Sequence, residues 1–250
     1  MAFLKRITPY AIAVLLLAVF YVRVPPPLRK TPYEHLQTFS LYRADLPSVQ
    51  ATPYDFLMFV VQWPFAVCAN KKCTNKSLPN NFTIHGLWPK NNSRYWDNCT
   101  GTPFSSSEMD RQPKLKTKLS VSWPNLKGKN MAFWEKQYNK HGSCCDDTFT
   151  QTEYFQTAHN MWSEHHVEKM FEDAGCTPGT KYERHKLKAA VKNKTKNNPA
   201  LRCRKDSNVL EEVVICYDHN GTEVIECNST LLDKCGSYET ILWEGPPMDV

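Results

Sequence analysis

The pattern of hydrophobic and polar positions predicts two strands at the start of the folded part of the chain. Residues 56–63 form an almost continuous apolar run, which is typical of a buried strand. Residues 82–85 alternate apolar and polar, so the two apolar side chains share one face and His85 points to the other. Gly86 permits a turn directly after this second strand.

Helical periodicity follows in the middle of the chain. A short helix is expected over Met131–His141, with Asn130 as N-cap and Gly142 at its end. A longer helical pattern runs from about Glu153 to Ala174, and the Lys-rich segment 181–196 is expected to be an exposed helix.

The remaining patterns settle the fold class. Residues 100–129 are polar and interrupted by three prolines, so we expect a loop-rich region. Residues 212–217 and 224–227 predict a hairpin around Asn220-Gly221. Together these elements predict an α+β domain, with a central, mostly antiparallel sheet and helices packed on it.

The N-terminal segment has a different pattern from the rest of the chain. Lys5 and Arg6 precede an apolar stretch from about Ile7 to Val22, which is the arrangement of a signal peptide. A small-x-small cleavage site does not follow, so an uncleaved signal anchor is the alternative. The chain divides accordingly into a leader, a Pro-rich linker or pro-segment and one folded domain, at residues 1–24, 25–53 and 54–250.

Composition places the protein outside the cell. Ten cysteines in 250 residues indicate a disulfide framework of the kind found in secreted proteins. Glycosylation sequons begin at Asn75, Asn81, Asn91, Asn98, Asn193, Asn220 and Asn228. We therefore expect a secreted, disulfide-bonded glycoprotein, with a structural glycoprotein anchored to the membrane through the leader as the alternative. The mean hydropathy of −0.53 excludes a polytopic membrane protein.

The positive charge is unevenly distributed. The formal net charge is +6, and residues 181–205 contain ten Lys or Arg against one Glu. Residues 111–129 contain six Lys or Arg and no acidic residue. Such segments suit a polyanionic partner, although solvated helix faces would show the same composition.

Two segments concentrate residues that can carry out acid–base chemistry. Residues 82–89 contain His85, and residues 133–145 contain His141. Helical spacing places Gln137, Lys140 and His141 on one face, so an amide, a cation and an imidazole lie together. With His85 opposite, this set suits attack of a ribose 2′-hydroxyl on its phosphodiester, which needs a base, an acid and positive charge.

The same two segments resemble the two active-site motifs of the ribonuclease T2 family in order and spacing. The resemblance extends from about Tyr54 to the C-terminal region and includes Val61-Gln62-Trp63-Pro64. Within the family, the doubled Cys144-Cys145, the Asn81 sequon and the basic balance resemble the plant self-incompatibility ribonucleases. The resemblance implies a T2-like fold and a secreted endoribonuclease for single-stranded RNA. Two alternatives stay open: a plant defence or phosphate-scavenging ribonuclease, and a catalytically weak extracellular recognition glycoprotein.

The resemblance also implies residue roles. His141 corresponds to the general base for the 2′-hydroxyl, His85 to the general acid for the 5′-oxygen, and Lys140 to the lysine that stabilises the phosphorane. The expected product is a 2′,3′-cyclic phosphate, formed without metal or other cofactor. Substrate contacts are expected from Trp88, Gln62, Phe133 and Trp134. RNA is the expected partner of a monomeric enzyme, with a pollen-side recognition partner if it serves self-incompatibility.

Two positions depart from the family pattern. The acidic residue four positions before the second histidine is replaced by Gln137, which makes Gln137 a candidate catalytic residue. Glu135 is nearby but points about 200° around the helix. Lys90 follows Trp88-Pro89 where many relatives have Asp, which leaves base preference open.

The resemblance finally implies a disulfide pattern. The expected pairs are Cys68 with Cys73, Cys99 with Cys144, Cys203 with Cys235, and Cys216 with Cys227, which leaves Cys145 and Cys176 for a fifth bridge. A zinc site at Cys144, Cys145 and the histidines His159, His165 and His166 is weakly supported, because the ligand spacings typical of zinc sites are missing. We expect these three histidines to lie on a helix surface or in the core.

Overall fold

The computed structural model describes residues 54–69, 73, 77–91 and 97–246. The leader and linker expected at residues 1–53 lie outside this part of the chain, as does Asn75. None of the helices in the described part is long and apolar enough to cross a membrane.

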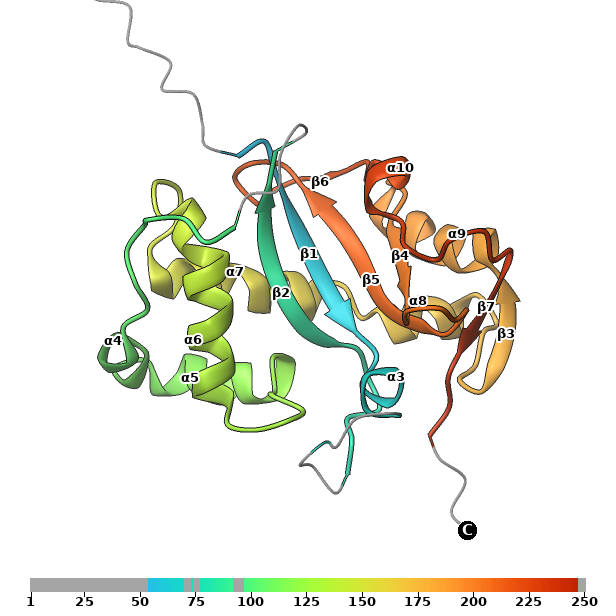
Figure 1. Ribbon diagram of the computed structural model, residues 1–250, viewed down its shortest axis with the longest axis horizontal. Helices are drawn as coiled ribbons and strands as arrows, with labels where there is room; N and C mark the ends of the chain where they lie inside the picture. The colour runs from blue at the N-terminus through green and yellow to red at the C-terminus, as the bar shows by residue number, and fades with distance from the viewer. Residues whose placement is uncertain (1–53, 70–72, 74–76, 92–96, 247–250) are drawn as a thin grey trace, which may run out of the picture. The chain divides into compact units, whose positions relative to one another are not determined.

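The main sheet contains five strands, and all its ladders are antiparallel (Figure 1). The strand order is β2-β1-β5-β4, and β6 also pairs with β5. The strands are β1 (Phe56–Gln62), β2 (Thr83–Lys90), β4 (Ala200–Cys203), β5 (Leu210–Tyr217) and β6 (Val224–Ile225). A separate two-stranded antiparallel sheet pairs β3 (Thr180–Glu183) with β7 (Thr240–Trp243). The α+β prediction is therefore confirmed.

Helices surround the main sheet, and α7 passes behind β1 and β2 in the view of Figure 1. The helices in the described residues are α3 (Pro64–Cys68), α4 (Ser106–Asp110), α5 (Pro113–Ser122), α6 (Asn130–Lys140), α7 (Gln151–Glu164), α8 (Val167–Asp173), α9 (Arg184–Thr195) and α10 (Ser229–Leu232), with a 3₁₀ helix η1 (Gly142–Cys145) after α6.

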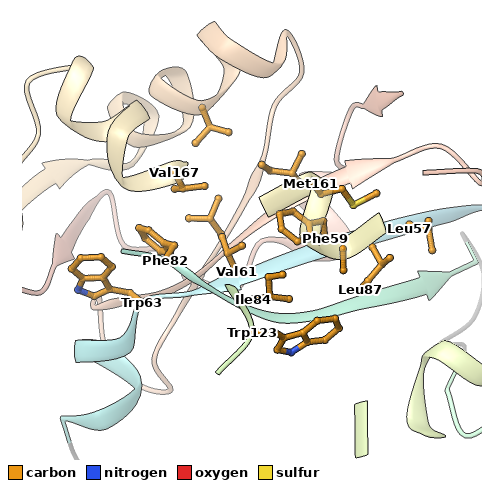
Figure 2. Close-up of a cluster of buried hydrophobic side chains, with 14 of the residues drawn as sticks. Leu57, Phe59, Val61, Trp63, Phe82, Ile84, Leu87, Trp123, Met161 and Val167 are labelled. Atoms are coloured by element: carbon orange, nitrogen blue, oxygen red, sulfur yellow. The ribbon is translucent and has the colours of Figure 1, made fainter. Parts of the chain in front are cut away.

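Strand β1 is buried on both faces, which explains its continuous apolar run. Leu57, Phe59 and Val61 point into the larger core, where they meet side chains from α5, α7 and α8 (Figure 2). Met58 and Val60 point to the opposite face, into a smaller core that α10 covers. Burying each such side chain contributes about 1.5–3 kcal/mol, so β1 anchors the domain.

Strand β2 does not turn at Gly86, as the sequence predicted, but continues to Lys90. The ladder register with β1 skips His85, which creates a β-bulge at that residue. The carbonyl of His85 instead accepts a hydrogen bond from the indole N–H of Trp123 at 3.1 Å. Ile84 lies in the larger core while His85 does not, so the predicted separation of the two side chains is confirmed.

The loop-rich expectation for residues 100–129 is wrong, because α4 and α5 lie there. Pro113 is the first residue of α5, a position where a missing N–H costs nothing. The expected helix over 153–174 is two helices, because the backbone leaves helical geometry at His165 and His166. The break turns Val167 toward the core.

The other two predicted helices are present with small differences. Asn130 is the first residue of α6, and Lys129 holds the N-cap position. The Lys-rich segment begins with β3 and continues as α9, which buries Leu187 and Val191 beneath its exposed lysines.

All four disulfides expected from the resemblance are present, at Cys68–Cys73, Cys99–Cys144, Cys203–Cys235 and Cys216–Cys227. The last of these bridges does not join opposed strand residues. The ladder partner of Cys216 is Ile225, and Cys227 lies two positions beyond the end of β6.

The prediction of a fifth disulfide is wrong, because Cys145 and Cys176 are both free and buried. The Sγ of Cys145 lies 3.2 Å from the carbonyl oxygen of Gly142 within η1, and that of Cys176 lies 4.0 Å from the carbonyl oxygen of Ala174. Burial raises the pKa of both thiols, which disfavours the thiolate that disulfide formation needs.

Candidate active site

A cavity of about 310 Å³ brings the two histidine segments together. Its walls come from β2, α6, β4 and neighbouring loops, with the lining residues His85, Trp88, Lys90, Asp97, Lys136, Gln137, Lys140, His141, Arg202 and Lys234. His85, His141, Lys140 and Gln137, the four residues predicted to act in catalysis, therefore meet at one place.

His85 is fixed by a carboxylate from a distant part of the chain. Its Nδ1 forms a short hydrogen bond with Oε1 of Glu212, and the other carboxylate oxygen of Glu212 lies 3.3 Å from the guanidinium of Arg202. Burial raises the pKa of Glu212, but His85 and Arg202 lower it by more, so its net pKa is below the ordinary value. The Nε2 of His85 is the nitrogen left for a substrate.

His141 follows the last residue of α6 and has a different environment. The side chain is only 5 % exposed, and its Nδ1 is buried without a hydrogen-bond partner among the described residues. Burial, followed by the positive charges of Lys140 and Lys90 and the proximity of His85, lowers the pKa of His141 from 6.5 to about 3. The imidazole is therefore neutral near pH 7 and able to accept a proton.

Trp88 connects the two histidines. Its ring centre lies 5.0 Å from that of His85 and 5.1 Å from that of His141, and the guanidinium of Arg202 lies 5.4 Å from its centre. The indole N–H donates a hydrogen bond of 3.0 Å to Oε1 of Gln137. Gln137 is 6 % exposed, so it lies inside the site rather than at an open surface.

The cavity is strongly cationic. Five Lys or Arg side chains line it, against Asp97 as the single carboxylate of the lining set, and Asp97 lies 3.7 Å from Lys140. Lys90 is buried, and its pKa is lowered to about 8, chiefly by this burial; Asp97 opposes the shift, and Arg202, Lys140 and Lys234 add to it. Such a cavity favours an anion such as a phosphodiester.

His85 also lines a second, smaller cavity of about 90 Å³. Gln62 and Phe133, both predicted substrate contacts, line it, and the Phe133 ring is stacked against His85 at 6.2 Å. The prediction of a substrate contact from Trp134 is wrong. Trp134 is 3 % exposed, and its indole N–H donates a hydrogen bond to the carbonyl of Trp123. A side chain enclosed in the core presents no face to a base.

Several residues of the site were not predicted from the sequence, namely Glu212, Arg202, Lys136 and Lys234. A signal existed for Glu212. It shares a strand face with Val214 and Cys216, which are buried, so an acidic residue there is out of place without a buried partner. Among the described residues, His, Cys, Asp and Glu form no group of three or more that could hold a metal ion.

Comparison with known proteins identifies the family. Residues 54–227 match the ribonuclease T2 family. The chain belongs to this family. It is 35 % identical to Ribonuclease 1 of Arabidopsis thaliana, over 77 % of the chain and 90 % of that protein, and 33 % identical to Ribonuclease S-6 of Nicotiana alata, over 76 % and 89 %. A solved structure of an RNase MC1 mutant in complex with 5′-UMP has a TM-score of 0.67 and 31 % identity, covering 76 % of the chain and 98 % of that structure.

Membership in the ribonuclease T2 family makes the chain an RNA-cleaving endoribonuclease. The cavity that holds both histidines is the candidate active site of this ribonuclease T2 domain.

Proposed function

We propose that this ribonuclease cleaves single-stranded RNA by transphosphorylation, with His141 as general base and His85 as general acid. The observation that carries the proposal is the opposite environment of the two imidazoles in one cavity. Burial and the neighbouring cations favour the neutral form of His141, whereas Nδ1 of His85 forms a hydrogen bond with the Glu212 carboxylate. Two titratable groups with opposing environments are the usual arrangement of an acid–base pair.

In the first step, the neutral imidazole of His141 takes the proton of the 2′-hydroxyl, and the 2′-oxygen attacks phosphorus. The bond from phosphorus to the 5′-oxygen breaks, and His85 donates a proton to that oxygen. The products are a 2′,3′-cyclic phosphate and a free 5′-hydroxyl. In the second step, the two histidines exchange roles: His85 takes a proton from a water molecule, whose oxygen attacks phosphorus. The bond from phosphorus to the 2′-oxygen breaks, His141 returns a proton to that oxygen, and a 3′-phosphate results.

The phosphorane formed on the way carries extra negative charge, which Lys140 and the neighbouring cations of the cavity stabilise. The bound phosphodiester also raises the pKa of His141 from its low value in the free enzyme, which makes this imidazole a stronger base once substrate is in place.

Substrate bases are assigned to Trp88 in the larger cavity and to Gln62 and Phe133 in the smaller one. Support comes from the RNase MC1 structure, in which a relative binds the nucleotide 5′-UMP. Two cavities that His85 lines in common suit the two nucleotides that flank the cleaved bond.

The decisive experiment compares cleavage of RNA by the wild-type protein and by His85→Ala and His141→Ala, each with and without EDTA. Losing one acid–base partner reduces the rate by about 10²–10⁴-fold. We expect wild-type activity to survive chelation and both variants to lose it by that factor. Cleavage by either variant at the wild-type rate contradicts the assignment of its histidine.

We also propose that the protein is secreted and glycosylated. The four disulfides suit an oxidising compartment. Four sequon asparagines of the described part are exposed, namely Asn98, Asn193, Asn220 and Asn228, while Asn81 and Asn91 are partly exposed. Intact mass of the secreted protein, before and after removal of N-glycans, measures both the leader cleavage and the number of glycans.

For the biological role we propose rejection of self pollen, as the resemblance to self-incompatibility ribonucleases implied. The identity with Ribonuclease S-6 supports it, and the similar identity with Ribonuclease 1 supports a general ribonuclease to a similar degree. Inactivating the gene should permit seed set after self-pollination, and a wild-type copy but not a His141→Ala copy should abolish it again. Equal self-seed set with and without the gene favours the general ribonuclease.

A further inference from the structure

We propose that Glu212 is a positioning residue for the general acid His85, and that Arg202 holds Glu212 in place. This inference rests on the proposed function, because it specifies how His85 becomes a proton donor. The three residues come from β2, β5 and β4. Arg202 and Glu212 are directly opposed in the ladder between β4 and β5, while β1 separates β5 from β2. The Glu212 side chain therefore reaches His85 across the strand between them.

Both oxygens of the Glu212 carboxylate are engaged. Oε1 meets Nδ1 of His85, and Oε2 lies 3.3 Å from the Arg202 guanidinium. The side chains of Glu212 and Arg202 are each 13 % exposed. Glu212 is absent from the cavity lining, whereas His85 and Arg202 line it. The carboxylate therefore acts through the imidazole and does not contact the substrate.

This contact determines which nitrogen of His85 reacts. A carboxylate accepts a hydrogen bond, so Nδ1 must carry the proton, and Nε2 remains as the nitrogen that gives a proton to the 5′-oxygen. The negative charge also stabilises the imidazolium, which is the form that a general acid needs.

The other charged groups around His85 make this carboxylate necessary. Lys90 on β2, Lys136 and Lys140 on α6, His141 after α6, Lys234 after α10 and Lys127 beside the smaller cavity are all basic. Asp97 is the one acidic residue among those lining the two cavities, and it lies beside Lys140. Gln137 adds no charge. Glu212 is therefore the carboxylate that faces His85 against this surplus of positive charge.

Arg202 has two effects on Glu212. Its positive charge keeps the carboxylate ionised, and the lowered pKa of Glu212 agrees with that state. The guanidinium also lies over the ring of Trp88, a residue that lines the cavity, and this cation–π contact helps to fix the position of Arg202 and so of Glu212.

The test is the pH dependence of Glu212→Gln on a dinucleoside substrate. Glutamine still accepts a hydrogen bond from Nδ1, so the geometry is kept while the charge is lost. Without the carboxylate, the imidazolium form of His85 loses the negative charge that faces Nδ1, and this is the form that donates the proton to the 5′-oxygen. We expect the alkaline limb of kcat/KM to move to lower pH and kcat to fall by at least about 10-fold, with little change in KM. Glu212→Asp should restore part of the loss.

The matched control is Glu244→Gln. Glu244 forms a similar partly buried ion pair, 3.4 Å from Arg204, and neither residue lines the cavity. Its pH profile should equal that of the wild type. Adding Arg202→Gln to Glu212→Gln removes the uncompensated cation, so it should move the alkaline limb back toward the wild-type position.

The outcomes separate the two proposals. An unmoved alkaline limb in Glu212→Gln, with His85→Ala inactive, overturns the role of Glu212 alone. Full activity of His85→Ala overturns the proposed function. If Glu212→Gln does not fold, ¹⁵N NMR of the wild-type protein decides. The inference requires the Nδ1–H form of neutral His85, and an Nε2–H form would overturn it.

Discussion

His85 and His141 show how the same side chain obtains two chemical properties from its neighbours. Nδ1 of His85 meets an ionised carboxylate, whereas Nδ1 of His141 is buried without a partner among the described residues. The first contact stabilises a positive imidazole, and the second environment opposes it. The Trp88 ring lies about equally close to both imidazoles, with ring centres 5.0 Å from His85 and 5.1 Å from His141.

Gln137 sets the charge next to His141, so Gln137→Glu should change the pH profile. The carboxylate can keep the hydrogen bond from Trp88 that Gln137 Oε1 now accepts. Its negative charge raises the pKa of His141, which is about 3 in the wild-type protein. The base must be neutral, so the acid limb of kcat/KM should move to higher pH, and the wild type should be the more active form under acidic conditions.

The control for this prediction is Glu135→Gln, which also changes one charge on α6 but at an exposed position about 200° around the helix. Its acid limb should match that of the wild type. Identical profiles for Gln137→Glu and the wild type would show that residue 137 does not contribute to the electrostatics of the base.

Trp88 and Trp134 should separate activity from stability. Trp134 is enclosed in the larger core, so Trp134→Ala should lower the free energy of unfolding by about 3–5 kcal/mol. Trp88→Ala removes the contact between the two histidines and should reduce kcat/KM with a smaller loss of stability. Urea denaturation and dinucleoside cleavage of both variants measure this, and a larger stability loss for Trp88→Ala would contradict the assignment.

Sequence reasoning reached the residues that lie in the two motifs and missed those that do not. His85, Gln137, Lys140 and His141 meet as expected, since motif spacing and helix geometry are local properties. Glu212 is far from both motifs along the chain and reaches His85 only through the strand order of the sheet. The prediction for Trp134 was wrong because consecutive residues of a helix point about 100° apart, so Phe133 can line a cavity while Trp134 points into the core.

At the scale of elements, strand β2 positions the site through its bulge and through Gly86. A Cβ at Gly86 would lie 2.0 Å from Nε1 of Trp88 and 2.6 Å from Oε1 of Gln137, so a side chain there must break their hydrogen bond. Gly86→Ala should therefore displace Trp88, and an error of about 1 Å at a catalytic site costs about 10²-fold in rate. Cleavage assays measure the loss, and circular dichroism checks that the fold is kept.

Gly128→Ala is the matched control, because a Cβ there meets its nearest atom at 3.4 Å, in ordinary van der Waals contact. This variant should cleave RNA at the wild-type rate. A Gly86→Ala variant with full activity would show that the hydrogen bond between Trp88 and Gln137 is not needed.

Two of the wrong predictions have the same cause: proline and glycine, which often end a helix or strand, can also occupy positions within one. Pro113 marks the start of α5 instead of a loop, and Gly86 allows close approach of Trp88 instead of a turn. The break between α7 and α8 at His165 contains neither proline nor glycine. We attribute it to packing, because it lets Val167 reach the core. Strand β1 was predicted correctly because burial on both faces leaves an unambiguous apolar run.

At the scale of the whole domain, two disulfides lie next to residues of the cavity. Cys203 follows Arg202, and its partner Cys235 follows Lys234, so this bridge joins two parts of the cationic wall. Cys144 is bonded to Cys99 and lies in η1, the short helix that begins at the residue after His141. The framework therefore restrains both sides of the site.

The disulfides should contribute to stability according to the length of chain that each one closes. Cys99–Cys144 spans 45 positions and Cys68–Cys73 spans 5. Loop-closure entropy gives about 4 kcal/mol for the longer loop and about 2 kcal/mol for the shorter one. Replacing both cysteines of a pair by serine should thus lower the free energy of unfolding more for Cys99–Cys144, as measured by urea denaturation.

The two variants should also differ in activity. Because Cys144 lies close to His141 along the chain, the variant without Cys99–Cys144 should lose activity, while the variant without Cys68–Cys73 should retain it below its unfolding transition. The reverse order in either measurement would show that native-state contacts, rather than chain entropy, determine what these bridges contribute.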